Sequence, residues 1–189
     1  MHSSLEGCDL GAIYAPQGAE DFECVNTVDD QDYEVFLQFD GKSRASTWRP
    51  IAVRRVRADE RQACNPSDFP WLGSHALIMR RSAVDALRDI LDSSVEVLPL
   101  STDDGVELFV LNARVIDALD EANSSLMKFP GTSRIMRTKK VAFVASAIKG
   151  VDLFRLPHRA SSTYVSERFV ERVKAAGLRG LVFNKVWSG

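Results

Sequence analysis

Apolar and polar residues alternate over one early stretch of the chain, residues 33–40. The apolar members of this stretch are Tyr33, Val35, Leu37 and Phe39. A repeat of two residues is typical of a strand that buries one face, and Asp40-Gly41 supplies turn chemistry directly after it. A second strand is predicted at residues 51–56. Residues 1–31 show weak periodicity and are predicted to form loops, with room for one short element.

Helical spacing appears first at residues 83–92, where Ser82 is the predicted N-cap. Val84, Leu87 and Leu91 recur at intervals of three and four residues, so they fall on one face of a helix. This segment is therefore predicted to pack one apolar face against a sheet.

A second helix is better specified. Ser166 is the predicted N-cap, and Glu167 suits the positive end of the helix dipole. Val165 and Val170 stand at the two positions of a hydrophobic staple, and Gly177 is the expected residue after the C-cap. The predicted buried stripe consists of Phe169, Val170, Val173 and Ala176.

Two hairpins are predicted from apolar runs that flank turn residues. The arms are residues 95–100 with 106–111, and residues 141–148 with 151–156. Asp104-Gly105 is a strong turn signal in the first hairpin, and Lys149-Gly150 plays the same part in the second.

A last strand is predicted at residues 181–187, with Leu181, Phe183 and Trp187 on one side. The strands come in hairpins, and the helices are inserted among them without strict alternation. This order predicts an α+β fold of antiparallel sheets with two or more packed helices.

Charge is distributed unevenly along the chain. The net charge is only −2, but residues 1–40 hold 10 acidic and no basic side chains, which leaves 16 acidic and 24 basic ones for the remainder. We therefore divide the chain into an acidic N-terminal segment, residues 1–47, packed on or appended to a main domain, residues 48–189. The acidic segment either meets an oppositely charged partner or complements the basic remainder of its own chain.

Sequence patterns also bear on the compartment. No apolar run reaches the roughly 18 residues that span a bilayer. Glu6 and Asp9 stand where a secretory signal would be basic and then apolar. Cys8, Cys24 and Cys64 form neither a metal-binding pair nor an even-numbered framework. We therefore expect a cytoplasmic protein with reduced thiols and no membrane association.

Metal and catalytic motifs are incomplete in this sequence. Asp30, Asp32 and Glu34 alternate as in a calcium-binding loop, but Val35 and Gly41 occupy the positions of its glycine and its last acid. A looser metal site in the acidic segment stays open as an alternative.

The three histidines, His2, His75 and His158, lack ligand spacing. Cys64 could meet His75 or His158 only through the fold. We expect no catalytic residues, no cofactor and no metal, and thus not an enzyme.

Two basic clusters raise the alternative of nucleic-acid binding. They consist of Arg54, Arg55 and Arg57, and of Arg134, Arg137, Lys139 and Lys140. A nucleic-acid-binding regulator would need both clusters to merge into one stripe. With a sequence pI near 5.9, direct nucleic-acid binding is not expected.

Several short blocks occur in a characteristic order. They are Asp68-Phe69-Pro70, Ser82-Ala83-Val84-Asp85-Ala86-Leu87, Leu98-Pro99-Leu100, Leu111-Asn112, Val115-Ile116-Asp117-Ala118-Leu119-Asp120, Ser124, Leu153-Phe154-Arg155-Leu156-Pro157, Tyr164-Val165-Ser166-Glu167-Arg168-Phe169, Gly177-Leu178-Arg179-Gly180, and Phe183 to Trp187. As an ordered series over residues 48–187, these blocks resemble the Imm11 immunity protein family of bacterial polymorphic-toxin and type VI secretion systems. The first 47 residues lie outside the resemblance.

The resemblance implies an antitoxin, encoded beside a toxin that is often a nuclease, which binds that toxin and neutralises it. It implies no catalytic residues. The alternatives are an enzyme whose active site is assembled from dispersed residues, and a nucleic-acid-binding regulator.

For an antitoxin, the acidic segment is the natural complement of a positively charged toxin groove. The predicted partner-binding residues are Glu20, Asp21, Glu23, Asp29, Asp30, Asp32, Tyr33 and Glu34.

Overall fold

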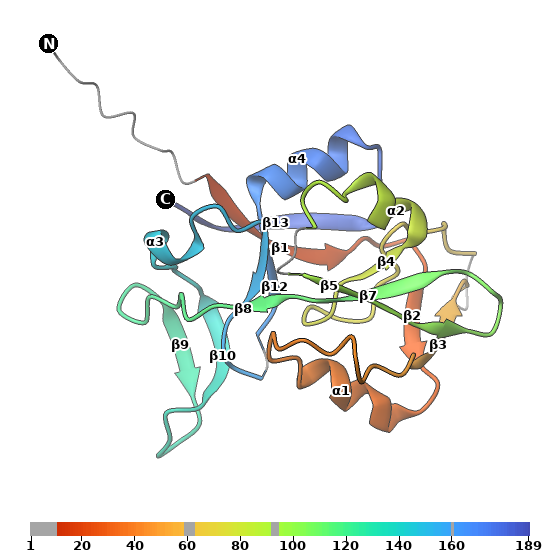
Figure 1. Cartoon of the computed structure of the whole chain (residues 1–189). Helices are drawn as coiled ribbons and strands as arrows, with labels where there is room; N and C mark the ends of the chain where they lie inside the picture. Colours follow the sequence, from red (N-terminus) through yellow and green to blue (C-terminus); the bar gives the residue numbers. More distant parts are fainter. Residues whose placement is uncertain (1–10, 59–62, 92–94, 160) are drawn as a thin grey trace, which may run out of the picture.

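The computed structural model describes residues 11–58, 63–91, 95–159 and 161–189 (Figure 1). In these ranges the chain forms four sheets and four short α-helices, with the longest helix nine residues in length. The α+β prediction is confirmed, although helices contribute less than the sequence pattern indicated. No helix in the same ranges is long and apolar enough to cross a membrane.

A five-stranded sheet organises the molecule. Its order is β13 (Leu181–Ser188), β1 (Ala12–Gly18), β12 (Thr163–Ser166), β11 (Leu153–Arg155) and β8 (Arg114–Val115). All neighbouring pairs are antiparallel except β11 and β8, which are parallel. β1 therefore lies between two strands from the far end of the chain.

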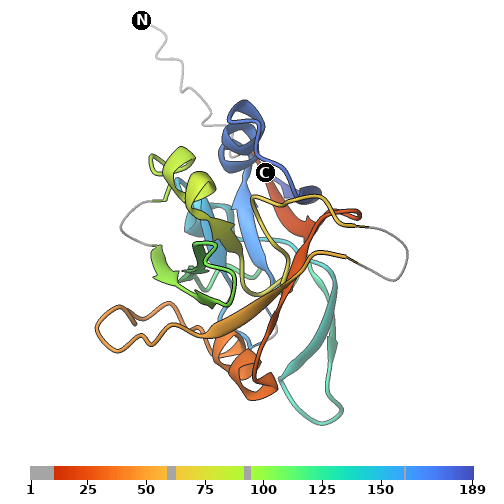
Figure 2. The ribbon, with the colours of Figure 1, turned by 90° about the vertical axis from the view of Figure 1, so that its right-hand side faces the viewer.

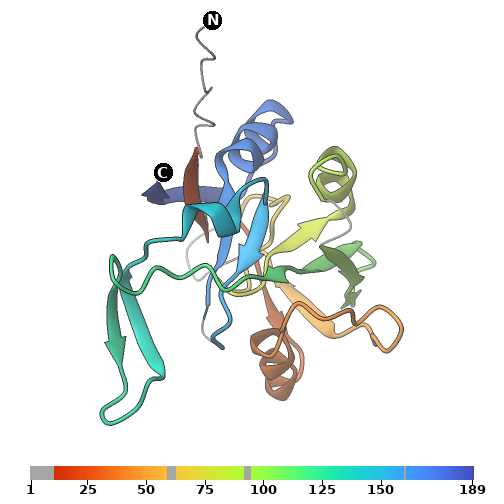
Figure 3. The same ribbon diagram turned by 60° about the vertical axis from the view of Figure 1, so that its left-hand side comes forward.

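Three smaller sheets complete the fold. The first has the order β4 (Ile78–Arg80), β7 (Leu108–Asn112) and β5 (Glu96–Pro99); the second has the order β2 (Cys24–Thr27), β3 (Ala52–Val56) and β6 (Ser101–Thr102). The third is a hairpin of β9 (Ser125–Lys128) and β10 (Ile135–Lys140). Figure 3 shows this hairpin projecting from the body of the molecule.

The helices lie at separate places on these sheets. A 3-10 turn, η1 (Asp30–Asp32), leads into α1 (Tyr33–Leu37), and the others are α2 (Arg81–Ala86), α3 (Ala145–Ile148) and α4 (Glu167–Ala175). Figures 1 and 2 both show α4 at one end of the molecule and α1 at the other.

Side-chain alternation along the strands produces three stacked core layers. Between the five-stranded sheet and β4–β7–β5 lies one layer, which contains Val165 and Phe109 and is covered by α2 and α4. The opposite face of β4–β7–β5 carries Val110 into a second layer, beneath α1. A third layer covers the outer face of the five-stranded sheet, where Phe143 packs against Tyr164 with ring centroids 5.0 Å apart. Successive residues of one strand thus belong to different layers.

Several predictions made from the sequence are confirmed. The Ser166 hydroxyl accepts the Phe169 N–H at 3.1 Å, as an N-cap should, and Gly177 follows α4 with φ +65°. β5 and β7 form the first predicted hairpin, and Gly105 takes φ +73° in its turn. β3 falls inside the strand predicted at residues 51–56. β13 matches the predicted last strand.

The strand predicted at residues 33–40 is wrong, because this stretch forms α1 and its C-terminal turn. The alternating pattern includes a further apolar residue, Phe36, which makes Tyr33, Phe36 and Phe39 a helical series. Phe36 and Phe39 are both buried, with ring centroids 5.8 Å apart. The three-residue spacing of these aromatic side chains therefore explains why the segment is helical.

The hairpin predicted at residues 141–156 is also wrong. Its first arm ends in α3, and β11 pairs with β12 and β8 instead. Of this predicted hairpin, the structure contains only the turn, where Gly150 has φ +74°. Phe143 and Ile148 are nevertheless buried, because this segment closes the third core layer.

A β-bulge overturns the prediction that Leu181, Phe183 and Trp187 share a side. The β1–β13 register shifts between Ile13 and Tyr14, which pair with Trp187 and Lys185. The extra residue reverses the alternation, so Phe183 packs in the first core layer and Trp187 in the third.

Three further expectations about local structure are wrong. Residues 12–18 and 24–27 form β1 and β2, where loops were predicted. Ser82 is not the N-cap of α2, because the extended residue Arg80 precedes the helix. Ala176 is exposed, because α4 ends one residue before it. The predicted helix end, Asp92, lies outside the described residues.

Arg155 is buried without a carboxylate partner. One guanidinium nitrogen, Nη1, donates to the backbone oxygens of Phe36 at 3.4 Å and Phe39 at 3.1 Å. The other, Nη2, donates to the oxygens of Arg159 and Ser161 at 3.4 and 3.3 Å. Burial lowers the pKa of Arg155 to about 10, which leaves it charged at neutral pH. A buried cation thus joins β11 to the end of α1.

Replacing Arg155 with Met should lower the free energy of unfolding by about 3 kcal/mol, because buried carbonyl groups lose their donor. Urea unfolding at neutral pH measures the change. Arg114→Met, at an exposed position on β8, is the matched control and should change stability by less than about 0.5 kcal/mol. Equal stability of the two variants would contradict this role of Arg155.

Candidate partner-binding site

The turn after β2 places three carboxylates at the surface. The Asp29 carboxylate accepts the Gln31 N–H at 2.9 Å and so caps η1, and the Asp29 backbone oxygen accepts the Asp32 N–H at 3.1 Å. Within the described ranges, Asp29, Asp30 and Asp32 make no ion pair. Their charge is therefore available to a partner.

A groove of about 440 Å³ lies beside this turn. Its lining residues are Asn26, Thr27, Asp30, Tyr33, Arg54, Val56 and Leu72. The Tyr33 ring packs edge-on against His75, with centroids 5.1 Å apart. Burial raises the pKa of Tyr33, so its hydroxyl stays protonated at neutral pH.

Apolar surface adjoins these acids. Val28 is 54% exposed and directly precedes the capping residue. We call the whole surface the acidic face and define it by Val28, Asp29, Asp30, Asp32, Tyr33 and Leu72. A mixed apolar and acidic patch of this kind is what a binding protein should show.

Glu23 does not belong to this surface, contrary to its inclusion among the predicted partner-binding residues. It is only 2% exposed. Its carboxylate accepts the Arg55 guanidinium at 2.8 Å, the Ser67 N–H at 3.1 Å and a bond from Arg80. Glu23 therefore binds together β3, β4 and the segment before β4. Sequence reasoning could not find this network, because its members lie far apart along the chain.

The remaining predicted residues separate into two places. Glu20 and Asp21 are exposed before β2, and Asp21 has φ +61°. Glu34 lies on α1 and forms an exposed ion pair with Arg159. β2 separates the first pair from the acidic face, so the predicted residues that the structure brings together there are Asp29, Asp30, Asp32 and Tyr33.

His75 lies half-buried under the Tyr33 ring. Burial and the nearby charge of Arg155 lower the pKa of His75 from 6.5 to about 4. His75 is therefore neutral at physiological pH, and acidification would place a second cation beside Arg155.

The described ranges contain no cluster of side chains that would bind a metal ion. No three His, Cys, Asp or Glu side chains there lie close enough to hold a metal ion. Cys24 and Cys64 carry free thiols, and burial raises the pKa of the Cys24 thiol. Cys8 and His2 lie outside the described residues.

The two basic clusters lie on β3 and β10, which stand on opposite sides of the molecule in Figure 1. Members of the first are paired: Arg55 contacts Glu23 and Asp104, and Arg54 lies 3.8 Å from Asp103. The clusters therefore do not merge into the single stripe that the nucleic-acid hypothesis requires.

A comparison with protein families gives a match for part of this chain. The model of the immunity protein family, Imm11, matches residues 101–188. No curated protein matches the chain. The Imm11 match runs from β6 to the end of β13 and includes Arg155, whereas the acidic face lies outside it.

The Imm11 match supports an immunity role and indicates a toxin as the partner. It also indicates a non-enzymatic role. The matched range is shorter than the resemblance over residues 48–187, and its first residue is Ser101.

Replacing Glu23 with Gln should lower the free energy of unfolding by about 3 kcal/mol, because Arg55 and Arg80 would lose their shared buried carboxylate. Chemical unfolding at neutral pH measures this loss. Glu20→Gln, at an exposed position, is the matched control and should be nearly neutral. If Glu23→Gln were as stable as that control, the structural role of Glu23 would be contradicted, and Glu23 would again count among the candidate partner-binding residues.

His75 should make stability depend on pH. Its folded pKa of about 4 is below the ordinary 6.5, so the unfolded chain binds the proton more readily. This contribution is complete above pH 6.5 and is lost as the pH falls toward 4. In His75→Phe, which cannot titrate, the free energy of unfolding should fall less between pH 7.5 and 4.5. Identical pH profiles would contradict the assignment.

Proposed function

We propose that this Imm11 protein is a cytoplasmic antitoxin that binds a cognate bacterial toxin encoded next to it. Binding occludes the toxin's active site or the surface through which its substrate enters. The observation that carries the proposal is the acidic face, where three carboxylates that make no ion pair within the described ranges adjoin the exposed Val28 and the half-buried Tyr33 and Leu72. This patch is suited to covering another protein.

The chemistry of the acidic face favours a basic toxin surface, such as the substrate groove of a nuclease. A lysine or arginine of the toxin can lay its aliphatic stem in the groove against Tyr33 and Leu72 while its charge meets Asp30. Tyr33 is the aromatic anchor in this arrangement, since aromatic residues contribute most at the centre of an interface. Asp29 and Asp32 add long-range attraction.

A complete interface must extend beyond the acidic face. A stable complex buries roughly 800 Å² on each partner, which takes about 20 to 30 residues a side. Glu20 and Asp21 at the other end of β2, and Glu34 on α1, are the neighbouring acids that a larger footprint would include. Charge in such a rim speeds association more than it sets the final affinity.

Co-expression with the adjacent toxin gene tests the proposal directly. We expect the immunity protein to restore growth of cells that make the toxin and to co-purify with it as a complex. Continued toxicity together with the absence of a complex would overturn the proposal. Turnover of a substrate by the protein alone would support an enzyme instead.

The acidic face makes a kinetic prediction. Asp29→Asn, Asp30→Asn and Asp32→Asn together remove three charges and keep the side-chain cap of η1, because Asn is also a good N-cap. Association with the toxin should slow by about tenfold at low salt and should lose most of its salt dependence. Stopped-flow measurements over a range of salt concentrations provide both values.

The matched control removes the same charge elsewhere, with Asp85→Asn, Asp117→Asn and Glu171→Gln, all at exposed positions. Its association rate should stay close to that of the unmodified protein. If both triple variants slowed equally, net charge would be responsible and the acidic face would not be the docking surface.

A further inference from the structure

The β9–β10 hairpin carries a charge opposite to that of the acidic face. Residues 125–140 contain five basic and no acidic side chains. Lys128 pairs with Glu121 at 2.8 Å, and Arg134 stacks over the Phe129 ring at 5.6 Å. The hairpin strands pair only with each other, and Figure 3 shows them standing away from the other sheets.

Apolar side chains are exposed on the same hairpin. Met127, Phe129 and Met136 are 40%, 43% and 42% exposed. The described ranges hold six exposed large hydrophobic side chains, so half of them lie on these few residues. Methionine and phenylalanine are enriched at protein interfaces, where flexible thioethers adapt to a partner.

A pocket of about 490 Å³ lies between the hairpin and the five-stranded sheet. Its lining residues are Ala15, Met136, Arg137, Thr138, Lys139, Lys140, Val141, His158, Ser162, Tyr164, Lys185 and Val186. No acid lines it, and four of these residues are cations. In the described ranges, none of those four makes an ion pair. The pocket therefore has an uncompensated positive charge.

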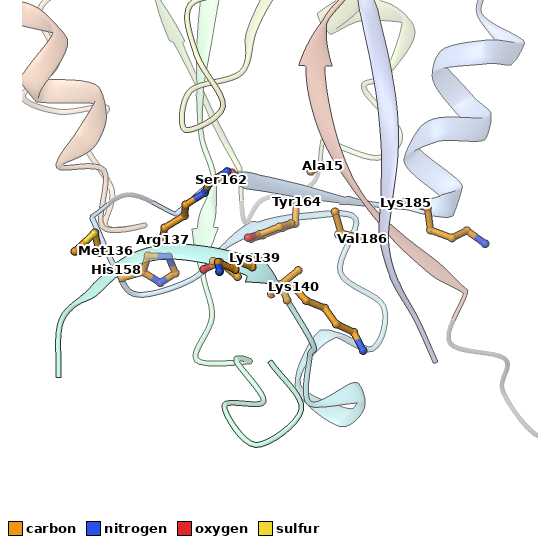
Figure 4. A pocket seen from close by; sticks show the side chains of 12 residues that line it. Ala15, Met136, Arg137, Lys139, Lys140, His158, Ser162, Tyr164, Lys185 and Val186 are labelled. Atoms are coloured by element: carbon orange, nitrogen blue, oxygen red, sulfur yellow. The ribbon is translucent and has the colours of Figure 1, made fainter. Parts of the chain in front are cut away.

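Hydrogen-bond donors line the inner wall of the pocket. Figure 4 shows Arg137 reaching toward Ser162, with the Tyr164 ring alongside, while Lys140 and Lys185 extend outward. Burial raises the pKa of Tyr164 to about 12, so its hydroxyl remains a donor at neutral pH. Guanidinium, ammonium and hydroxyl groups all donate to carboxylate oxygens.

We propose that the hairpin and this pocket, together called the basic face, form a second docking surface that holds an acidic segment of a protein partner. Acidic side chains enter the pocket and pair with Arg137 and Lys139, while Lys140 and Lys185 extend outward beside it. Apolar residues of the same segment contact Met127 and Met136. This surface is separate from the acidic face, so the inference does not depend on where the toxin binds.

A protein segment fits the basic face better than a nucleic acid does. Phe129 is the one aromatic residue of the hairpin, and Arg134 already covers its ring, whereas single-stranded nucleic acid needs free stacking platforms. The pocket has room for side chains and is lined by four cations, and the other basic cluster lies across the molecule. Exposed methionines add apolar contacts that a phosphate backbone cannot use.

Fluorescence anisotropy with the full-length protein tests the proposal. The probes are a labelled peptide rich in Glu and Leu, the same peptide with Gln in place of Glu, and a single-stranded oligonucleotide of equal net charge. We expect the acidic peptide to bind most tightly. Hydrogen exchange should show protection at residues 125–140 when it is bound.

A charge-reversed variant with Arg137→Glu, Lys139→Glu and Lys140→Glu should weaken binding of the acidic peptide by at least about tenfold. These positions are exposed, and circular dichroism checks that the variant folds. The matched control, Lys149→Glu with Lys174→Glu and Arg179→Glu, makes the same charge change at exposed positions away from the hairpin and should bind within about twofold of the unmodified protein.

Three results would overturn the proposal. They are an equal loss in both triple variants, tighter binding of the oligonucleotide than of the acidic peptide, and failure of the acidic peptide to bind or to protect the hairpin. None of these results bears on toxin binding by the acidic face, so the two proposals fail independently.

Discussion

A buried positive charge connects two parts of this chain that lie far apart in the sequence. Arg155 comes from β11 inside the Imm11-matched region, and the backbone oxygens it binds include Phe36 and Phe39 at the end of α1. A helix of five residues has little stability of its own. The position of α1, and with it the acidic face on the preceding turn, therefore depends on a side chain more than 110 residues away. The Arg155 guanidinium and the second core layer, where Phe36 and Phe39 lie with Leu108 and Val110, together join the matched part of the chain to the acidic face.

Sequence periodicity correctly predicted the elements whose structure is determined by residues within the element itself. α4 has its cap, its buried stripe and its terminal glycine within one short stretch, and the β5–β7 hairpin has a turn that permits few alternatives. Residues 33–39 show the limit of this approach, since the same apolar residues satisfy both a strand and a helix. Burial of Phe36 in the second core layer selects the helix, and that packing is not visible in local sequence.

Prediction of the candidate site was limited by the same cause. Charge counting located an acidic segment but could not separate surface carboxylates from one that is buried. Glu23 and Asp30 look alike in the sequence, but in the fold Glu23 forms ion pairs with Arg55 and Arg80. Part of the acidic segment thus complements basic residues of its own chain, and part remains available. Complementation within the chain thus applies to Glu23, while a charged partner for Asp29, Asp30 and Asp32 stays a prediction.

The pairing of β1 with β12 and β13 has a consequence for how the protein folds. β1 joins strands about 150 residues further along, so its two hydrogen-bonding edges stay unsatisfied until nearly all of the described chain has left the ribosome. Such distant contacts slow folding, and they leave a bare strand that can pair with another molecule. Closure of the five-stranded sheet should therefore limit how quickly newly made chains reach the folded state, and chaperones that cover the free edges of β1 should raise the yield.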